Sequence, residues 1–485
     1  MSKNILKVCN GFKNVRSYSS LKEMPICEFK PVKYEGPSYE QLQNIRQTKL
    51  NPALTTFYSK PLALNQGYKQ WLFDINGKRY LDLFGGICTV SVGHCHPKVN
   101  EATIKQLETL THVSNIYYHP KLHEYASRLA DKMPGNLKVV YFVNSGSEAN
   151  DLAMLMARVY TNNFEILSLM NAYHGMSPQT MGLTSMPSYR YSIPQPPGIH
   201  HVMNPDVYTG LWGGSHCRDS PVQTKRTCDC SPNECKAGDN YLQQLSQFFT
   251  YNLASGHVAA MFAESIQGLG GVVQFPKNYI KGAYKLVKEY GGLFVSDEVQ
   301  AGFGRTGDHF WGFEAHGITP DIVTMAKGIG NGYPLAAVVT TPDIAKALTK
   351  SGHFNTFGGN PVASAVGIAV LDVIEEEKLQ ENSKKVGTYF LLELEKLSEK
   401  YPVIGDVRGK GLMIGVELVN PGTKEPLDRK KSLQVLDESL NMGVILGKGG
   451  IYGNVLRIKP PMCVTKEDVD FSLSVLEEVF KKISQ

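Results

Sequence analysis

The sequence predicts an α/β fold, with a large unit in which a mainly parallel sheet lies between helices and a smaller α+β unit at the C-terminal end. Short apolar runs alternate with helical stretches between Lys138 and about Thr341. This alternation is typical of a parallel sheet that helices cover on both faces. With 485 residues, the chain is also long enough for two or three domains and a large core.

The first residues have the composition of a targeting segment. The first 22 residues contain lysines and Arg16 but no acid, and three serines follow Arg16 closely. They lack the continuous apolar core of a secretory signal, so they are typical of a mitochondrial transit peptide, with a disordered basic tail as the alternative. We expect residues 1–20 to be a transit peptide that is cleaved between Arg16 and Ser20, and the mature protein to lie in the mitochondrial matrix.

The overall composition excludes several classes of partner. Charged residues make up 20% and hydrophobic residues 42% of the chain, which is ordinary for a globular protein. The net charge of +5 is small for this length, and no basic stripe indicates nucleic-acid binding. No apolar run reaches the roughly 18 residues that a membrane helix needs. We therefore expect neither nucleic acid nor membrane as a partner.

Residues 21–80 are predicted to form a polar, proline-containing arm followed by a β-hairpin. In the hairpin, apolar residues alternate on one face, and Asn76-Gly77 supplies a two-residue turn. The alternating residues are Trp71, Phe73 and Ile75.

Residues 81–342 are predicted to form the large unit. Its expected strands are 139–143, 164–169, 258–263, 293–296, 322–326 and 335–339. In such sheets ligands bind outside the carboxyl ends of the strands. Four polar residues stand at or just past these ends, namely Ser145, Glu264, Asp297 and Lys327.

Two of these residues indicate a shared chemistry. Lys327 follows a buried apolar run, and burial lowers the pKa of an amine and frees it as a nucleophile toward an aldehyde. Asp297 ends another buried strand, where a carboxylate could keep a pyridine nitrogen protonated. Pyridoxal phosphate requires both groups. Each residue alone has an ordinary explanation, a solvated strand end for Lys327 and a loop cap for Asp297.

A third stretch could bind a phosphate. Ser145-Gly146-Ser147-Glu148-Ala149-Asn150 follows the strand at 139–143 and opens a predicted helix. Backbone N–H groups at a helix start, exposed by glycine, bind phosphate. An ordinary N-cap would explain Ser145 equally well, but the order of the three stretches favours a cofactor site.

These residues resemble the motifs of the class-III, fold-type I, pyridoxal-phosphate-dependent aminotransferases. The resemblance covers the chain from about Leu54 to Ile483. Its further motifs are Ala172-Tyr173-His174-Gly175, the stretch 297–307, Lys327 and the stretch 355–361. It implies a fold-type I transferase, a small C-terminal domain at 343–485, and an N-terminal hairpin that docks on that small domain.

The resemblance also implies a role for each site residue. Lys327 would bind the cofactor aldehyde and move the substrate proton, and Asp297 would hold the pyridine nitrogen. Gly146 and Ser147 would bind the phosphate, Tyr173 would stack on the ring, and Gln300 would reach the ring oxygen. His174, Glu264 and Val299 would complete the cofactor contacts. Thr356 would reach the phosphate of a partner subunit, which implies a homodimer or homotetramer with a shared active site.

Substrate choice depends on one arginine. Arg457 matches the family arginine that clamps a substrate carboxylate. Related enzymes for ornithine have an arginine where Met176 stands, and those for ornithine or 4-aminobutyrate have a gating glutamate where Leu269 stands. An unmasked Arg457 favours small amino acids such as alanine and small 2-oxo acids such as pyruvate and glyoxylate, in a ping-pong transfer.

Three other functions remain open. A phospho-lyase of a phosphorylated amine has the same cofactor machinery, but it needs further basic groups for the substrate phosphate. A broader ω-amino-acid:pyruvate aminotransferase would also fit. A catalytically silent protein of this fold is disfavoured because Lys327 and Asp297 are both present.

One segment interrupts the alternation of strands and helices. Residues 187–240 are rich in proline and glycine and are predicted to be an insertion. Its cysteines are Cys217, Cys228, Cys230 and Cys235. Four thiolates could close a zinc site, but the spacing lacks paired Cys-x2-Cys knuckles, and disulfides are unusual in a reduced compartment. We expect free thiols and no metal, with zinc and disulfides as the alternatives.

Overall fold

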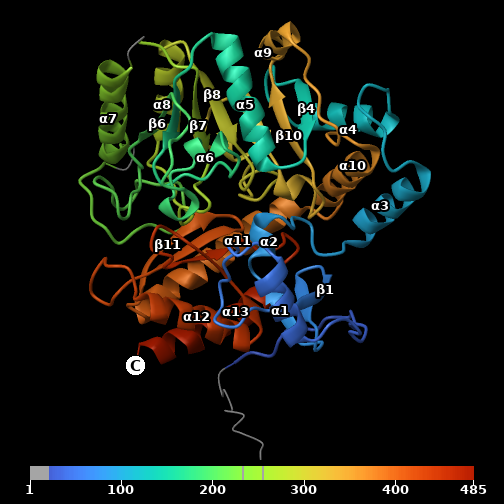
Figure 1. The fold of residues 1–485 in the computed structure, drawn as a ribbon. Coiled ribbons are helices and arrows are strands. Elements are labelled where there is room, and N and C mark those ends of the chain that lie inside the picture. The colour runs from blue at the N-terminus through green and yellow to red at the C-terminus, as the bar shows by residue number, and fades with distance from the viewer. Residues whose placement is uncertain (1–20, 232–233, 254–255, 485) are drawn as a thin grey trace, which may run out of the picture.

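The computed structural model describes residues 21–231, 234–253 and 256–484. The predicted transit peptide, residues 1–20, lies outside the described residues. In Figure 1 the chain forms two layers, a sheet with helices above and a second group of helices and strands below. The lower group combines N-terminal and C-terminal segments of the chain, drawn in blue and red.

The upper layer contains a seven-stranded sheet in the order β4-β10-β9-β8-β7-β5-β6. Its strands are β4 (Val139–Val143), β5 (Ile166–Leu169), β6 (Ile199–Val202), β7 (Ala260–Glu264), β8 (Leu293–Asp297), β9 (Ile322–Met325) and β10 (Ala336–Thr340). Only β10 runs against its neighbours, β4 and β9. The predicted fold, a mainly parallel sheet between helices, is confirmed.

Helices cover both faces of this sheet because alternate strand residues point to opposite sides. Ala260 and Phe262 of β7 pack in the same cluster as the buried face of α5 (Gly146–Thr161). The intervening Met261 packs in the cluster that contains α7 (Lys236–Asn252) and α8 (Tyr279–Glu289). Figure 1 shows α5 crossing in front of the strands.

The shorter helices of this part are α6 (Thr180–Leu183), α9 (Pro342–Ala347), η1 (Pro187–Tyr189), η2 (Gly312–His316), η3 (Lys327–Ile329) and η4 (Leu348–Lys350).

The edge strand β6 lies inside the segment that the sequence predicts as an insertion. It has only four residues, two of which are His200 and His201, so it lacks the apolar run by which the other strands are recognised. A connection of more than 30 residues then leads from β6 to α7. Its described residues form no helix or strand.

The N-terminal segment begins with α1 (Tyr39–Lys49) and a sheet in the order β1-β2-β3-β13. Its strands are β1 (Leu64–Tyr68), β2 (Trp71–Asp74), β3 (Arg79–Asp82) and β13 (Val444–Ile445). Because β13 pairs in parallel with β3, the hairpin is joined to the C-terminal part of the chain. Helices α2 (Gly85–Cys88), α3 (Pro97–Thr109) and α4 (Pro120–Asp131) follow.

The predicted two-residue turn at Asn76-Gly77 is wrong. Asp74 pairs with Lys78, which leaves a three-residue loop that ends at Gly77 with a φ of 78°. The Asp74 carboxylate decides this geometry, since it accepts hydrogen bonds from the backbone N–H groups of Asn76 and Lys78, both at 2.9 Å. A three-residue hairpin loop with a left-handed last residue is a common alternative.

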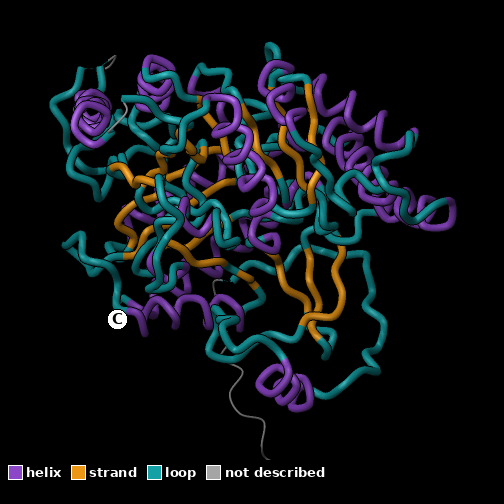
Figure 2. Tube along the Cα trace, turned by 45° about the horizontal axis from the view of Figure 1, so that its top comes forward, coloured by secondary structure: helices purple, strands orange, loops and turns teal. Residues whose placement is uncertain are grey.

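The C-terminal segment builds a four-stranded antiparallel sheet in the order β11-β12-β15-β14. Its strands are β11 (Ile404–Lys410), β12 (Met413–Leu418), β14 (Gly447–Gly449) and β15 (Val455–Ile458), and its helices are α11 (Leu379–Lys400), α12 (Arg429–Asn441) and α13 (Lys466–Ile483). Figure 2 shows the strands of the molecule in orange and the surrounding helices in purple. Helix α10 (Pro361–Glu376) packs instead against α3 and α4. The predicted division at 342/343 therefore stays a prediction, and we propose a boundary between α10 and α11.

Candidate active site

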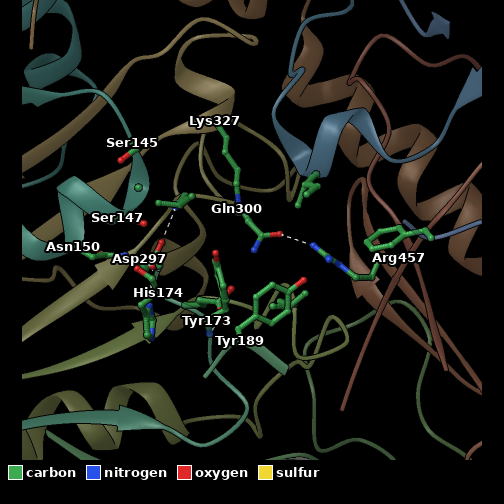
Figure 3. Close-up of a pocket in the computed structure, with 17 residues that line it drawn as sticks. Ser145, Ser147, Asn150, Tyr173, His174, Tyr189, Asp297, Gln300, Lys327 and Arg457 are labelled. Carbon is green, nitrogen blue, oxygen red and sulfur yellow. Dashed lines mark hydrogen bonds and ion pairs between the residues drawn. The ribbon is translucent and has the colours of Figure 1, made fainter. Parts of the chain in front are cut away.

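A cavity of about 230 Å³ opens where the carboxyl ends of the parallel strands face β15. Figure 3 shows side chains from both parts of the chain converging on it. The residues predicted from the sequence that line it are Gly146, Ser147, Tyr173, His174, Glu264, Asp297, Val299, Gln300, Lys327 and Arg457. Of the predicted site residues, Thr356 alone does not line it and is exposed.

Lys327 lies two residues after the end of β9, at the start of η3, and its side chain extends into the cavity (Figure 3). Its backbone lies in the left-handed region, with a φ of 55°. Non-glycine residues pay for this conformation and keep it where the surroundings impose it, often at functional sites. Burial lowers the pKa of the Lys327 amine, and the nearby Arg457 guanidinium acts in the same direction. The amine is thereby more readily available in its uncharged, nucleophilic form.

Asp297 ends β8 and is held by neighbours on three sides. One carboxylate oxygen accepts a hydrogen bond from Asn150 at 2.9 Å and is hydrogen-bonded to Nδ1 of His174 at 2.8 Å. The other accepts the backbone N–H of Val299 at 3.1 Å. The carboxylate is 4% exposed, so these contacts fix its orientation.

The part that Asn150 plays could not be seen from the sequence. Besides Asp297, its amide donates to the carbonyl of His174 at 2.8 Å, and its oxygen accepts from Thr324 at 2.8 Å. Asn150 therefore ties α5, β8 and β9 together beneath the cavity. In the sequence, Asn150 could have been recognised as a polar residue on the otherwise apolar face of a predicted helix.

The start of α5 forms the end of the cavity nearest the sheet. Ser145 caps the helix by accepting the N–H of Glu148 at 3.2 Å, which leaves the N–H groups of Gly146 and Ser147 without a partner within the helix. Space is tight around them, because a Cβ on Gly175 would lie 2.6 Å from Oγ of Ser147. The arrangement presents free N–H groups and a hydroxyl to an anion.

Aromatic side chains and a carboxyl group form part of the walls of the cavity. The rings of Tyr173 and Tyr189 meet edge to face with centroids 5.3 Å apart. Glu264, at the end of β7, accepts the N–H of Gly268 at 2.7 Å, and burial together with the nearby Asp297 raises its pKa. Tyr189 comes from the segment that was predicted as an insertion, and the sequence alone gave no indication of its place here.

Two basic residues lie on the β15 side of the cavity, and of the two only Arg457 lines it. Arg457, on β15, is 1% exposed and donates to Oε1 of Gln300 at 3.1 Å. Lys459 is fully buried and donates to the same oxygen at 2.8 Å. Burial lowers the pKa of Lys459 well below its ordinary value, and Arg457 lowers it further. Lys459 was missed by the sequence analysis, although a lysine inside an apolar run was visible.

Neither cation has an acidic partner. Across the described residues, no carboxylate forms an ion pair with Arg457 or Lys459, and Nε of Arg457 has no hydrogen-bond partner. Leu269 lines the cavity near Arg457, where its apolar side chain offers no counter-charge. An anion that enters the cavity would therefore find an unmatched guanidinium.

These features fit pyridoxal phosphate. A lysine with a lowered pKa suits an aldehyde, a fixed carboxylate suits a pyridine nitrogen, and the start of α5 suits a phosphate. Nε2 of His174 is buried and has no hydrogen-bond partner among the described residues, so a polar atom remains available beside the Asp297 carboxylate. The site residues therefore suit the cofactor that the sequence analysis expects.

The family model of the class-III aminotransferases matches residues 57–480, so the chain belongs to this family. The chain is a pyridoxal-phosphate-dependent aminotransferase, as predicted. It is similar to the mitochondrial alanine–glyoxylate aminotransferase 2 of Homo sapiens, with 54% identity across 93% of this chain and 88% of the human protein. It is 45% identical to the mitochondrial alanine–glyoxylate aminotransferase 2 homolog 2 of Arabidopsis thaliana, across 95% of this chain and 91% of that protein.

Solved structures agree with this assignment. An ω-transaminase from Thermomicrobium roseum superposes with a TM-score of 0.82 and 31% identity, across 93% of this chain and 100% of that one. A phospholyase from Arthrobacter in complex with phosphoethanolamine superposes with a TM-score of 0.81 and 31% identity, across 91% and 99%. No helix in the described ranges is long and apolar enough to span a membrane.

Proposed function

We propose that this aminotransferase moves the amino group of alanine to glyoxylate by a ping-pong mechanism in the mitochondrial matrix. The observation that carries the proposal is the buried Arg457, which has no acidic partner in the part of the chain that the structure describes. Alanine and glyoxylate are small and share one carboxylate, so one unmasked guanidinium can recognise both. The names of the human and plant relatives and their mitochondrial designation support it.

The residues divide the work between the two sides of the cavity. When bound, the cofactor supplies an aldehyde for the amino group and a ring that takes up the electron pair freed at the α-carbon. Lys327, whose pKa is lowered by burial, would take the proton from the α-carbon of the donor and later return it. Asp297 would hold a proton at the ring nitrogen, and Arg457 would fix the carboxylate of donor and acceptor in turn.

The remaining contacts would orient the cofactor. Gly146 and Ser147 would donate to its phosphate, and Tyr173 would lie on its ring. Gln300 would reach the ring oxygen through its amide nitrogen, because its carbonyl oxygen is already taken by Arg457 and Lys459. His174, Glu264 and Val299 line the same part of the cavity.

We further propose a homodimer or homotetramer in which Thr356 completes the active site of a partner subunit. Thr356 is exposed and does not line the cavity of its own chain, and its sequence neighbours Phe354 and Phe357 are 58% and 61% exposed. Exposed aromatic residues beside one another are typical of an interface.

A panel of donors and acceptors on the purified protein tests the substrate proposal. Alanine should convert the cofactor spectrum to that of the amine form, and glyoxylate should restore it, whereas 4-aminobutyrate should react weakly. The alternative, a phospho-lyase, predicts turnover of phosphoethanolamine that needs no 2-oxo acid. Turnover of that kind, with no response to alanine, would overturn the proposal.

A further inference from the structure

Three of the four cysteines of the connection between β6 and α7 converge in the structure, and the fourth, Cys235, lies beside one of them. The sulfurs of Cys217, Cys228 and Cys230 all lie within 4.8 Å of one another. Cys217 Sγ is 4.0 Å from that of Cys228 and 3.9 Å from that of Cys230. Cys235 Sγ lies 3.7 Å from the carbonyl oxygen of Cys217, and its side chain also interacts with the Cys217 thiol.

These distances match a metal site. Four thiolates around zinc at about 2.3 Å, placed tetrahedrally, have sulfurs separated by about 3.8 Å. The observed separations of 3.9 and 4.0 Å are close to this value and about twice the length of a disulfide bond. The three sulfurs are therefore arranged as ligands of a common centre.

The surroundings favour a structural rather than a catalytic metal. Cys217 is 0% and Cys235 5% exposed, and both belong to a small separate hydrophobic cluster with Val207 and Ala237. The backbone N–H groups of Gly238 and Lys277 interact with the Cys235 sulfur. The cluster lies outside the cavity lined by Lys327, since none of its residues lines that cavity.

We propose that Cys217, Cys228, Cys230 and Cys235 bind one structural Zn²⁺. Cys217, Cys228 and Cys230 form three corners of the site. Cys235, whose sulfur lies beside the Cys217 backbone but not within 4.8 Å of all three of the other sulfurs, would supply the fourth. Binding releases the thiol protons to solvent and leaves four zinc–sulfur bonds. The sequence spacing led us to expect free thiols, and the assembled geometry now favours the zinc alternative.

A bound metal would stabilise the connection between β6 and α7, which has few other sources of stability. Its described residues form no helix or strand, and its own apolar cluster is small. Long connections without secondary structure require another source of stability. A metal that joins Cys217 to Cys235 would close the loop between them at the start of α7.

The cysteine site is connected to the wall of the active-site cavity through a series of ion pairs and hydrogen bonds. Arg218, next to Cys217, forms a two-pronged ion pair with Asp406 at 2.7 and 3.0 Å. Asp406 also holds Arg408, which donates to the carbonyl of Gly271 at 2.7 Å. Gly271 lies two residues from Leu269 of the cavity. Zinc would therefore anchor a chain of contacts that runs from the connection to the substrate side of the active site.

Elemental analysis of the purified wild-type holoenzyme is the first test. Protein from zinc-supplemented medium, purified without chelator, should contain about one zinc per chain. An organomercurial reagent should release that zinc as it titrates the thiols. Zinc below about a tenth of an equivalent per chain, with the four thiols freely reactive or joined in disulfides by mass mapping, would overturn the proposal.

Variants locate the ligands. Cys228→Ser should lose the zinc, and Cys27→Ser, which removes a cysteine of the N-terminal arm, should keep it. Cobalt exchanged into the wild type should give the visible absorption of a tetrahedral cobalt thiolate, and Cys235→Ser should weaken its sulfur-to-metal charge-transfer band. If Cys228→Ser fails to fold, the cobalt spectrum of the wild type decides alone. Zinc that stays bound in a folded Cys228→Ser protein would contradict the assignment.

Discussion

The two sides of the active-site cavity differ in how their charges are matched. On the side of the parallel strands, the Asp297 carboxylate is satisfied by Asn150, His174 and the backbone of Val299. On the side of β15, Arg457 and Lys459 share one neutral oxygen of Gln300 and have no acid in the described ranges.

The difference indicates which side of the cavity has its polar groups already paired and which side still requires an anionic partner. A buried charge without a counter-charge is costly, so the cationic side gains most from an incoming anion. The satisfied side can position a resident group with little rearrangement. We infer that the strand side is organised for the cofactor and the β15 side for a substrate carboxylate that leaves after each half-reaction.

The largest expected effect comes from the strand side. Lys327→Ala should lower kcat by at least about three orders of magnitude, since the nucleophile and the proton carrier are removed together. Reduction of the wild type with borohydride should fix the cofactor mass on Lys327. The matched control is Lys459→Met, in which the same peptide should still carry the cofactor. Trapping on Lys459 in the wild type would sink the assignment of Lys327.

The next largest effect tests whether Arg457, on the β15 side, binds the substrate carboxylate. Arg457→Lys keeps the charge but loses the planar fork that binds a carboxylate through two hydrogen bonds. The apparent Michaelis constants for alanine and glyoxylate should rise together by about one to two orders of magnitude, with a normal cofactor spectrum. Half-reaction titrations followed by cofactor absorbance measure both constants. Unchanged values would mean that the carboxylate is bound elsewhere.

An acidic residue introduced beside Arg457 should supply the counter-charge that the guanidinium lacks. Leu269→Glu places a carboxylate near Arg457, where it would pair with the guanidinium whenever no substrate carboxylate is bound. Alanine should react about tenfold less efficiently, and ω-amino acids should become relatively better donors. Leu269→Gln has nearly the same shape without the charge and serves as the control. Equal effects of glutamate and glutamine would show that shape rather than charge governs this position.

The smallest effect concerns pH and the buried Lys459. Its pKa in the folded protein is lowered well below 10.5 by burial, so between these two values the unfolded chain binds one proton more. Stability therefore rises with pH in that window, by up to about 1.4 kcal/mol per pH unit, and below the window the full cost of burying the charge remains.

Lys459→Met should lose this contribution, so its stability relative to the wild type should be greatest at low pH and decline as the pH rises toward 10.5. Denaturant unfolding of both proteins at about pH 7 and about pH 9 measures the difference. A difference that does not change with pH would show that Lys459 keeps its proton in the folded protein.

The sequence by itself determined the fold class, the family and most residues of the cavity. Strands such as 322–325 are continuous apolar runs, so their ends can be located, and a parallel sheet brings those ends to one edge. Lys327, Asp297 and the start of α5 could therefore be predicted together. The motifs that identify the cofactor are also contiguous in the chain, which makes them visible without a structure.

Tertiary structure alone decided which polar groups meet. Asn150 and Asp297 are 147 residues apart, and Arg457 and Gln300 are 157 apart, so no local pattern could pair them. The same holds for β6, which has no apolar run, and for the turn at Gly77, where the Asp74 side chain selects the longer loop. The spacing of the four cysteines argued against a metal, and only the folded connection brings Cys217, Cys228 and Cys230 within 4.8 Å of one another. Directional contacts between distant segments depend on how the sheets and helices assemble, which linear spacing does not encode.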